Sequence, residues 1–153
     1  MTAPLLEYLQ LDDIRMRLAS QGQGPLVLFS HGWPESWYSW RHQLAAVAAA
    51  GYRAVAPDMR GYGGTDAPQE PAKYSLLHLA PWRGAPIRQP SVFIAGARDG
   101  DLRFPASSVQ IDRYASTLPG LRGCPILEGA GHWIQRERSA TVSALSLEFL
   151  RGL

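Results

Sequence analysis

Two residues of catalytic type follow short apolar segments in the second half of the chain. Asp99 comes four residues after Ala95, and His132 comes five residues after Leu127. A histidine that is held by a carboxylate keeps one tautomer and can draw a proton from water. Such a pair would serve a hydrolytic reaction in which the activated water attacks an ester.

Each of these residues also has an ordinary structural interpretation, because aspartate is common in turns and a lone histidine often packs or caps. The order of acid and then histidine, each after its own apolar segment, favours a joint catalytic role for Asp99 and His132. Asp101 competes for the role of acid, but Asp99 lies nearer the end of the predicted strand and is better fixed.

The tetrapeptide His31-Gly32-Trp33-Pro34 directly follows Ser30 and the apolar run over residues 26–29. A strand that ends in a tight turn with glycine and proline leaves backbone N–H groups unpaired, and such donors can hold an oxyanion. Loops at the carboxyl ends of parallel strands line one crevice. We therefore expect the tetrapeptide to lie near Asp99 and His132.

An attacking group in a recognisable setting is missing from the sequence, which contains neither Gly-x-Ser-x-Gly nor Gly-x-Asp-x-Gly. His42 falls in a predicted helix and His78 in a short apolar segment, and neither has a second ligand at metal spacing. The glycines of residues 61–64 match no phosphate-binding motif. The sequence thus predicts neither a metal site nor a bound cofactor.

Short apolar runs that alternate with helical patterns predict an α/β fold with a mostly parallel sheet. The run over residues 26–29 is uniformly apolar, which is typical of a strand that is covered on both faces. The sequence predicts an N-terminal hairpin that turns at Asp12 and Asp13. Strands are predicted over 5–11, 14–18, 26–29, 52–57, 91–95 and 124–127, and helices over 38–50, 74–80, 107–117 and 141–153.

The composition is that of one folded domain, since 46% of the 153 residues are hydrophobic and 18% are charged. Fifteen Lys and Arg residues face thirteen Asp and Glu residues without any block of five like charges. This balance argues against partners among nucleic acids or anionic membranes. No apolar segment reaches transmembrane length, so we expect a cytoplasmic protein. The lone Cys124 is expected to be a small buried group in a strand.

Four segments of the sequence resemble epoxide hydrolases of the α/β-hydrolase fold, particularly bacterial ones. They are HGWPESWYSWRHQ over residues 31–43, DMRGYGGTDAP over 58–68, FIAGARDG over 93–100 and GHWIQ over 131–135. The resemblance covers nearly all of residues 5–153. It implies a three-layer α/β-hydrolase fold in a single domain over residues 1–153, with an N-terminal half over 1–80 and a C-terminal half over 81–153.

The resemblance also implies roles for the candidate residues. Asp99 would orient His132, and His132 would activate the hydrolytic water. The backbone N–H of Trp33 would be one oxyanion donor, in a turn shaped by His31, Gly32 and Pro34. The substrate would be a small hydrophobic epoxide, which water converts into a vicinal diol through an alkyl-enzyme ester, without a cofactor.

The sequence departs from this family at the centre of the chain. The family places an aspartate nucleophile in a Gly-x-Asp-x-Gly elbow, followed by a helical cap with two tyrosines, and neither is present here. Residues 76–80 resemble the helix before the elbow strand, and residues 81–84 resemble the segment after the cap. We therefore interpret the chain as internally truncated and expect it to lack epoxide hydrolase activity. Packing roles are expected for the remaining tyrosines, Tyr62, Tyr74 and Tyr114.

Two alternatives to an epoxide hydrolase are a non-catalytic remnant or engineered minimal α/β domain, and a weak residual esterase that uses His132 as its base. Loss of the central strands would leave sheet edges without neighbours. Either residues 26–29 pair directly with residues 91–95, or the exposed edges recruit another chain, which predicts a homodimer.

Overall fold

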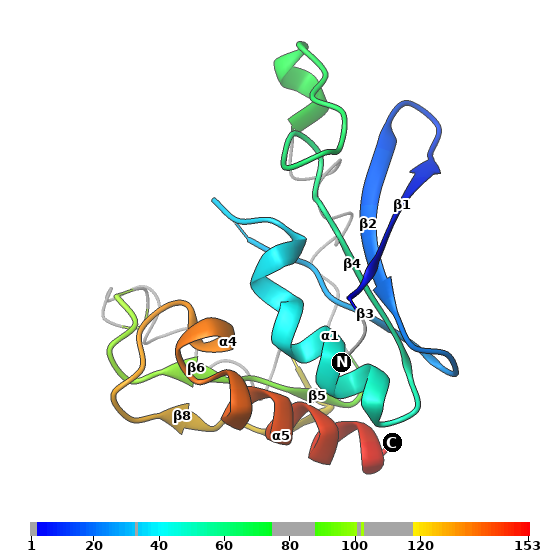
Figure 1. The fold of residues 1–153 in the computed structure, drawn as a ribbon. Coiled ribbons are helices and arrows are strands. Elements are labelled where there is room, and N and C mark those ends of the chain that lie inside the picture. The colour runs from blue at the N-terminus through cyan, green and yellow to red at the C-terminus, as the bar shows by residue number, and fades with distance from the viewer. Residues whose placement is uncertain (1–2, 33, 75–87, 101, 103–117) are drawn as a thin grey trace. The chain divides into compact units, whose positions relative to one another are not determined.

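The computed structural model describes residues 3–32, 34–74, 88–100, 102 and 118–153 (Figure 1). The chain divides into two compact units, residues 1–82 and 83–153, and each is described by itself. The predicted helix over 107–117, all but the first residue of the one over 74–80, and Asp101, His78 and Tyr114 lie outside the described residues. The single domain and the pairing of residues 26–29 with 91–95 stay predictions.

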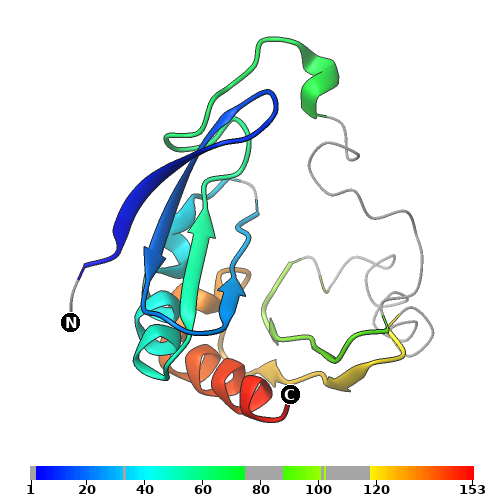
Figure 2. The ribbon, with the colours of Figure 1, turned by 90° about the vertical axis from the view of Figure 1, so that its right-hand side faces the viewer.

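A four-stranded sheet in the order β1-β2-β4-β3 forms the first unit (Figures 1 and 2). β1 (Leu5–Gln10) and β2 (Arg15–Gln21) are antiparallel, with Gln10 opposite Arg15 across the turn, so the predicted hairpin is confirmed. β4 (Arg53–Pro57) runs antiparallel to β2 and parallel to β3 (Leu26–Leu28). The predicted strand, helix, strand sequence with a parallel pair is therefore present.

A helical segment connects β3 to β4 and supplies part of the core of this unit. Ser36 caps the short helix η1 (Trp37–Trp40), which leads into α1 (Arg41–Ala49). Gly51 follows with a φ of +90°, a conformation that favours glycine and ends the helix as predicted. α1 packs against β4 and β2 and buries Leu44 and Val47 completely.

The expectation that β3 is covered on both faces is wrong. The side chains of Leu26 and Leu28 are 63% and 64% exposed. β3 stands at one end of its four-stranded sheet, and α1 packs chiefly on β4 and β2. A uniformly apolar run is therefore not sufficient evidence of a buried strand here, because burial depends on which other elements cover the strand.

The turn of the hairpin is tied to the long segment that follows β4. The backbone N–H of Arg15 donates to Asp66 Oδ2 at 2.7 Å, and the Asp66 N–H returns a bond to the Arg15 carbonyl. Arg60 and Lys73, the latter in η2 (Pro71–Tyr74), both pair with Asp13 at 2.9 Å. These two cations hold the pKa of the Asp13 carboxyl well below its usual range.

Short parallel pairs form the second unit. β5 (Ser91–Val92) pairs with β7 (Leu121–Gly123), and β6 (Ala95–Gly96) pairs with β8 (Ile126–Leu127). The strand predicted over 91–95 is thus interrupted, and only residues 126–127 of the one predicted over 124–127 form a strand, whereas β7 was not predicted. Pro125 offers no N–H to a ladder, which accounts for the break between β7 and β8. Cys124 lies in this break and is exposed, so its predicted burial in a strand is wrong.

The described part of the second unit also contains α4 (Ile134–Glu137) and α5 (Ser139–Arg151), and α5 confirms the predicted closing helix. The apolar residues of this helix predict a buried face, but the four of them are only half-buried: Leu145, Leu147, Phe149 and Leu150. Leu145 and Phe149 line an open cavity of about 270 Å³. No helix among the described residues has the length and apolar character needed to cross a membrane.

Candidate catalytic site

Asp99 and His132 lie within hydrogen-bond distance of each other, as predicted. The Nδ1 atom of His132 is 3.1 Å from Oδ2 and 3.2 Å from Oδ1 of Asp99. The Asp99 side chain is 12% exposed, whereas the His132 side chain is 50% exposed. A proton on Nδ1 donates to the carboxylate and leaves Nε2 as the acceptor atom of the ring. Asp99 is thus the fixed member of the pair, and His132 is the member that solvent reaches.

The neighbouring parallel strands β6 and β8 bring these two residues together. Asp99 follows β6 in a turn that its N–H closes on the Gly96 carbonyl at 3.0 Å. His132 follows β8 after residues 128–131. The Arg98 N–H donates to the Ala130 carbonyl at 2.8 Å and joins the two loops. The prediction that each residue follows its own strand and that the two lie close together is confirmed, and the structure adds that the two strands pair directly.

Gly96 allows these two loops to approach each other closely. A Cβ atom at this position would meet the carbonyl oxygens of Ala130 and Gly131 and would lie 2.6 Å from the carbonyl carbon of Ala130. Backbone atoms cannot move aside as the end of a side chain can. The absence of a side chain at Gly96 is therefore a condition for the observed spacing between Asp99 and His132.

Glu137 holds the backbone on both sides of His132. Its carboxylate accepts the Gly131 N–H at 2.8 Å and the Trp133 N–H at 3.2 Å. Two bonds to one carboxylate restrict the loop and hence the direction of the His132 ring. Sequence reasoning missed this residue. The available signal was an acidic residue in the first turn of a helix that directly follows a candidate catalytic histidine.

The turn at residues 31–34 belongs to the first unit, and its histidine is used structurally. His31 is 6% exposed, and its Nε2 accepts the Met59 N–H at 2.9 Å. Its Nδ1 donates to the Gly32 carbonyl at 2.8 Å. Nε2 thus holds the turn against the loop after β4, and Nδ1 makes a bond within the turn itself. Trp33 lies outside the described residues, so its role as an oxyanion donor stays a prediction.

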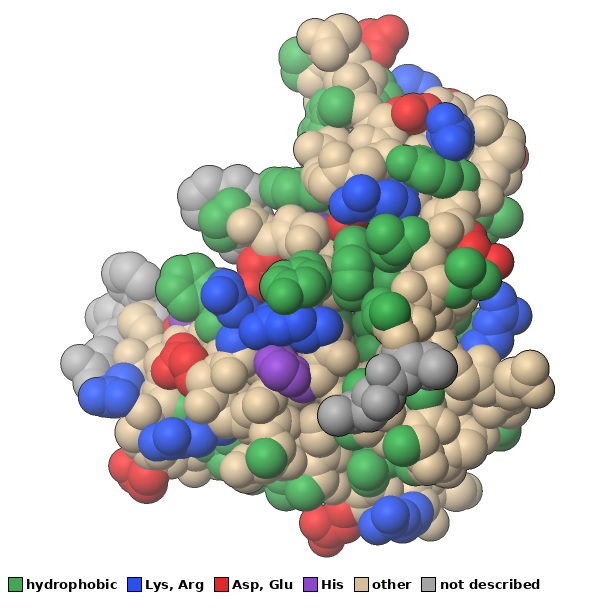
Figure 3. Space-filling model, viewed as in Figure 1, with side chains coloured by type: hydrophobic (Ala, Val, Ile, Leu, Met, Phe, Trp, Pro, Cys, Tyr) green, Lys and Arg blue, Asp and Glu red, His purple; other side chains and the backbone are tan. Residues whose placement is uncertain are grey.

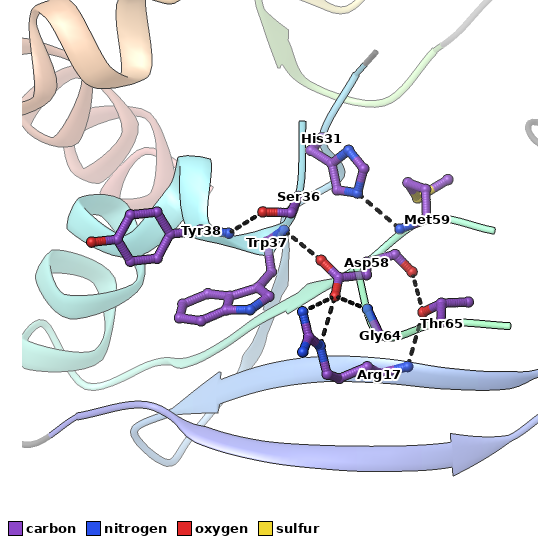
Figure 4. Close-up of polar contacts among 9 residues, drawn as sticks. All are labelled: Arg17, His31, Ser36, Trp37, Tyr38, Asp58, Met59, Gly64 and Thr65. Carbon is purple, nitrogen blue, oxygen red and sulfur yellow. Dashed lines mark hydrogen bonds and ion pairs between the residues drawn. The ribbon is translucent and has the colours of Figure 1, made fainter. Parts of the chain in front are cut away.

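Asp58 is a fully buried carboxylate at the end of β4 that sequence reasoning did not single out (Figure 4). Its Oδ2 accepts from Arg17 Nε at 2.7 Å and from the Gly64 N–H at 3.0 Å. Its Oδ1 accepts the Trp37 N–H at 2.9 Å. One side chain therefore ties β2, the start of η1 and the glycine loop together. Burying a charge is costly unless the charge is paired and hydrogen-bonded, as the Asp58 carboxylate is.

The glycine loop after Asp58 is shaped to receive that carboxylate. Gly63 has a φ of +54°, and a Cβ there would overlap the Asp58 carboxylate. Tyr62 packs edge-to-face on His31 with a centroid distance of 5.4 Å, and Tyr74 Oη donates to the Pro68 carbonyl at 2.9 Å. The expected packing roles of Tyr62 and Tyr74 are confirmed.

Among the described residues, no group of three or more His, Cys, Asp or Glu side chains is arranged to hold a metal ion. The chemistry that the contact between Asp99 and His132 supports is proton transfer. His132 can accept a proton from water while Asp99 stabilises the resulting imidazolium. The expected convergence of the 31–34 turn with this pair joins two separate units and stays a prediction.

Comparisons with known proteins agree with this architecture. The profile of a family described as alpha/beta hydrolase fold matches residues 25–82. An epoxide hydrolase from Vigna radiata superposes with a TM-score of 0.92 at 19% identity, with 99% of each chain covered. Potato epoxide hydrolase I superposes with a TM-score of 0.90 at 19% identity, over 98% of this chain and 100% of that one. The chain has the α/β-hydrolase fold.

Sequence similarity to curated proteins is confined to part of the chain. Epoxide hydrolase 3 of Siraitia grosvenorii is 59% identical over 66 residues, which are 43% of this chain and 21% of that protein. An epoxide hydrolase of Caballeronia sordidicola is 49% identical over 78 residues, 50% of this chain and 24% of that protein. The chain thus spans about a fifth to a quarter of the length of these two relatives.

Proposed function

We propose that Asp99 and His132 are the acid and base of an epoxide hydrolase site. The observation that carries this proposal is the 3.1 Å contact between His132 Nδ1 and Asp99 Oδ2, with a buried acid and a half-exposed histidine. In this role His132 takes a proton from the water that hydrolyses an alkyl-enzyme ester, and Asp99 stabilises the imidazolium. Similarity to plant and bacterial epoxide hydrolases supports the reaction class. The bacterial assignment stays a prediction.

We further propose that the 153-residue chain does not complete the reaction. The ester can form only if a carboxylate attacks the epoxide carbon, and the sequence offers no Gly-x-Asp-x-Gly elbow. Loss of a nucleophile removes several orders of magnitude in rate. The chain then keeps the acid–base part of a site whose attacking part is absent. The substrate class, a small hydrophobic epoxide, and a cytoplasmic location belong to this proposal.

Diol formation from a styrene-type epoxide by the purified chain tests this proposal. We expect a rate equal to that of an Asp99→Asn variant and of buffer alone. Turnover that disappears in Asp99→Asn would contradict the proposed inactivity and would show that another group attacks the epoxide. Hydrolysis of an activated ester, measured on the same two proteins, tests the alternative of a residual esterase. That alternative requires a rate that Asp99→Asn lowers.

A further inference from the structure

The outer edge of β1 is an apolar strand edge. β1 stands at the end of the sheet opposite to β3, and no described strand pairs with its outer side. On the face drawn in Figure 3, hydrophobic side chains reach the surface over the β1–β2 hairpin, at the upper right. The exposed fractions are 61% for Leu5, 49% for Leu6, 50% for Tyr8 and 48% for Leu9.

The register of the hairpin shows which backbone groups face outward. The Leu11 N–H donates to the Ile14 carbonyl, so this facing pair is hydrogen-bonded. Hydrogen-bonded pairs alternate along an antiparallel ladder, so residues 5, 7 and 9 direct their N–H and C=O groups toward β2. Leu6, Tyr8 and Gln10 therefore direct theirs to the outer edge, where they can pair with another strand.

The usual protections of an edge strand are missing from β1. Natural edge strands carry lysine, proline, bulges or unpaired charges that oppose pairing with a second chain. The sequence of β1, LLEYLQ, contains neither lysine nor proline, and its register with β2 is regular. Its one charged residue, Glu7, accepts a hydrogen bond from Ser20 Oγ at 2.8 Å. The Arg15 guanidinium lies 3.8 Å from the centre of the Tyr8 ring and orders that ring.

We propose that β1 pairs with β1 of a second copy of this chain, antiparallel and with Tyr8 facing Tyr8 on a two-fold axis. A two-fold contact uses the same surface on both copies. Only registers that match outward residues with outward residues can form the ladder. The register with Leu6 facing Tyr8 would place Glu7 against Glu7, and like charges in facing positions are destabilising. The Tyr8-centred register places Glu7 against Leu9 and Leu6 against Gln10, so it has no like-charge pair.

Sedimentation equilibrium of the full chain tests this dimer up to about 1 mM chain. We expect the average mass to rise from one chain toward two as the concentration increases. Tyr8→Lys places two ammonium groups on the axis, and Tyr8→Glu places two carboxylates there, so each variant alone is expected to stay monomeric. An equal mixture of the two variants faces lysine with glutamate and is expected to recover the dimer.

Two further variants separate this interface from other ones. Leu28→Lys changes an exposed leucine on the other end strand and should leave dimerisation unchanged. Glu7→Gln should also leave it unchanged, whereas it would strengthen a register with Glu7 facing Glu7. A chain that stays monomeric at every concentration would overturn the proposal. So would a dimer that Tyr8→Lys does not weaken, a mixture that does not recover, or a dimer that only Leu28→Lys disrupts.

Discussion

Replacing Asp58 with asparagine is expected to lower the free energy of unfolding of the first unit by about 3 kcal/mol. The carboxylate is fully buried and accepts from Arg17 and from the backbone N–H groups of Trp37 and Gly64. An asparagine offers one oxygen instead of two and turns an NH₂ group toward donors. The Arg17 guanidinium then loses its partner in a position where its side chain is only 27% exposed.

Urea unfolding followed by tryptophan fluorescence measures this loss, because Trp37 and Trp40 lie in the first unit. Asp12→Asn is the matched control, since it removes a carboxylate that is exposed at the hairpin turn and should change stability by less than about 0.5 kcal/mol. Adding Arg17→Met to Asp58→Asn removes the stranded charge and should cost less than the two single changes together. Equal stabilities for Asp58→Asn and Asp12→Asn would contradict the structural role assigned to Asp58.

Replacing Gly96 with alanine is expected to destabilise the second unit by about 2 kcal/mol or more and to separate Asp99 from His132. The added Cβ would lie 2.6 Å from the carbonyl carbon of Ala130, so the loop that carries His132 must move away from β6. Chemical denaturation gives the stability. The NMR signals of the His132 ring report the contact with Asp99. The effect of Asp99→Asn on these signals is compared between the unaltered chain and the Gly96→Ala variant.

Gly100→Ala is the control in the same loop, because a Cβ at Gly100 would meet nothing within 4 Å. It should keep both the stability and the coupling between Asp99 and His132. If Gly96→Ala behaved like Gly100→Ala in both measurements, close approach at Gly96 would not be what positions the pair.

The sequence was sufficient for features that local patterns determine. The hairpin at Asp12 and Asp13, the helix that ends at Gly51 and the closing helix α5 all follow from apolar spacing and turn residues. The contact between Asp99 and His132 was predictable for a related reason. Adjacent parallel strands end at the same edge of a sheet, so polar residues that follow them lie close together.

Features that depend on distant parts of the chain were not predictable. Burial of Asp58 requires Arg17 from a strand 41 positions earlier, and no local pattern announces that partner. Exposure of Leu28 and Cys124 depends on what covers a strand or a break in a strand, which an apolar run does not specify. Glu137 lay within reach of sequence reasoning, since it is close to His132, but its bonds to two backbone N–H groups appear only in the structure.

The tautomer of His132 tests the central claim of a catalytic acid–base pair most directly. Long-range ¹H–¹⁵N NMR spectra of the ¹⁵N-histidine-labelled chain, recorded at about pH 9 where an ordinary imidazole is neutral, distinguish a proton on Nδ1 from one on Nε2. We predict a proton on Nδ1, directed at Asp99, and loss of that preference in Asp99→Asn. A proton on Nε2 in the unaltered chain, or a tautomer that Asp99→Asn leaves unchanged, would contradict the claim.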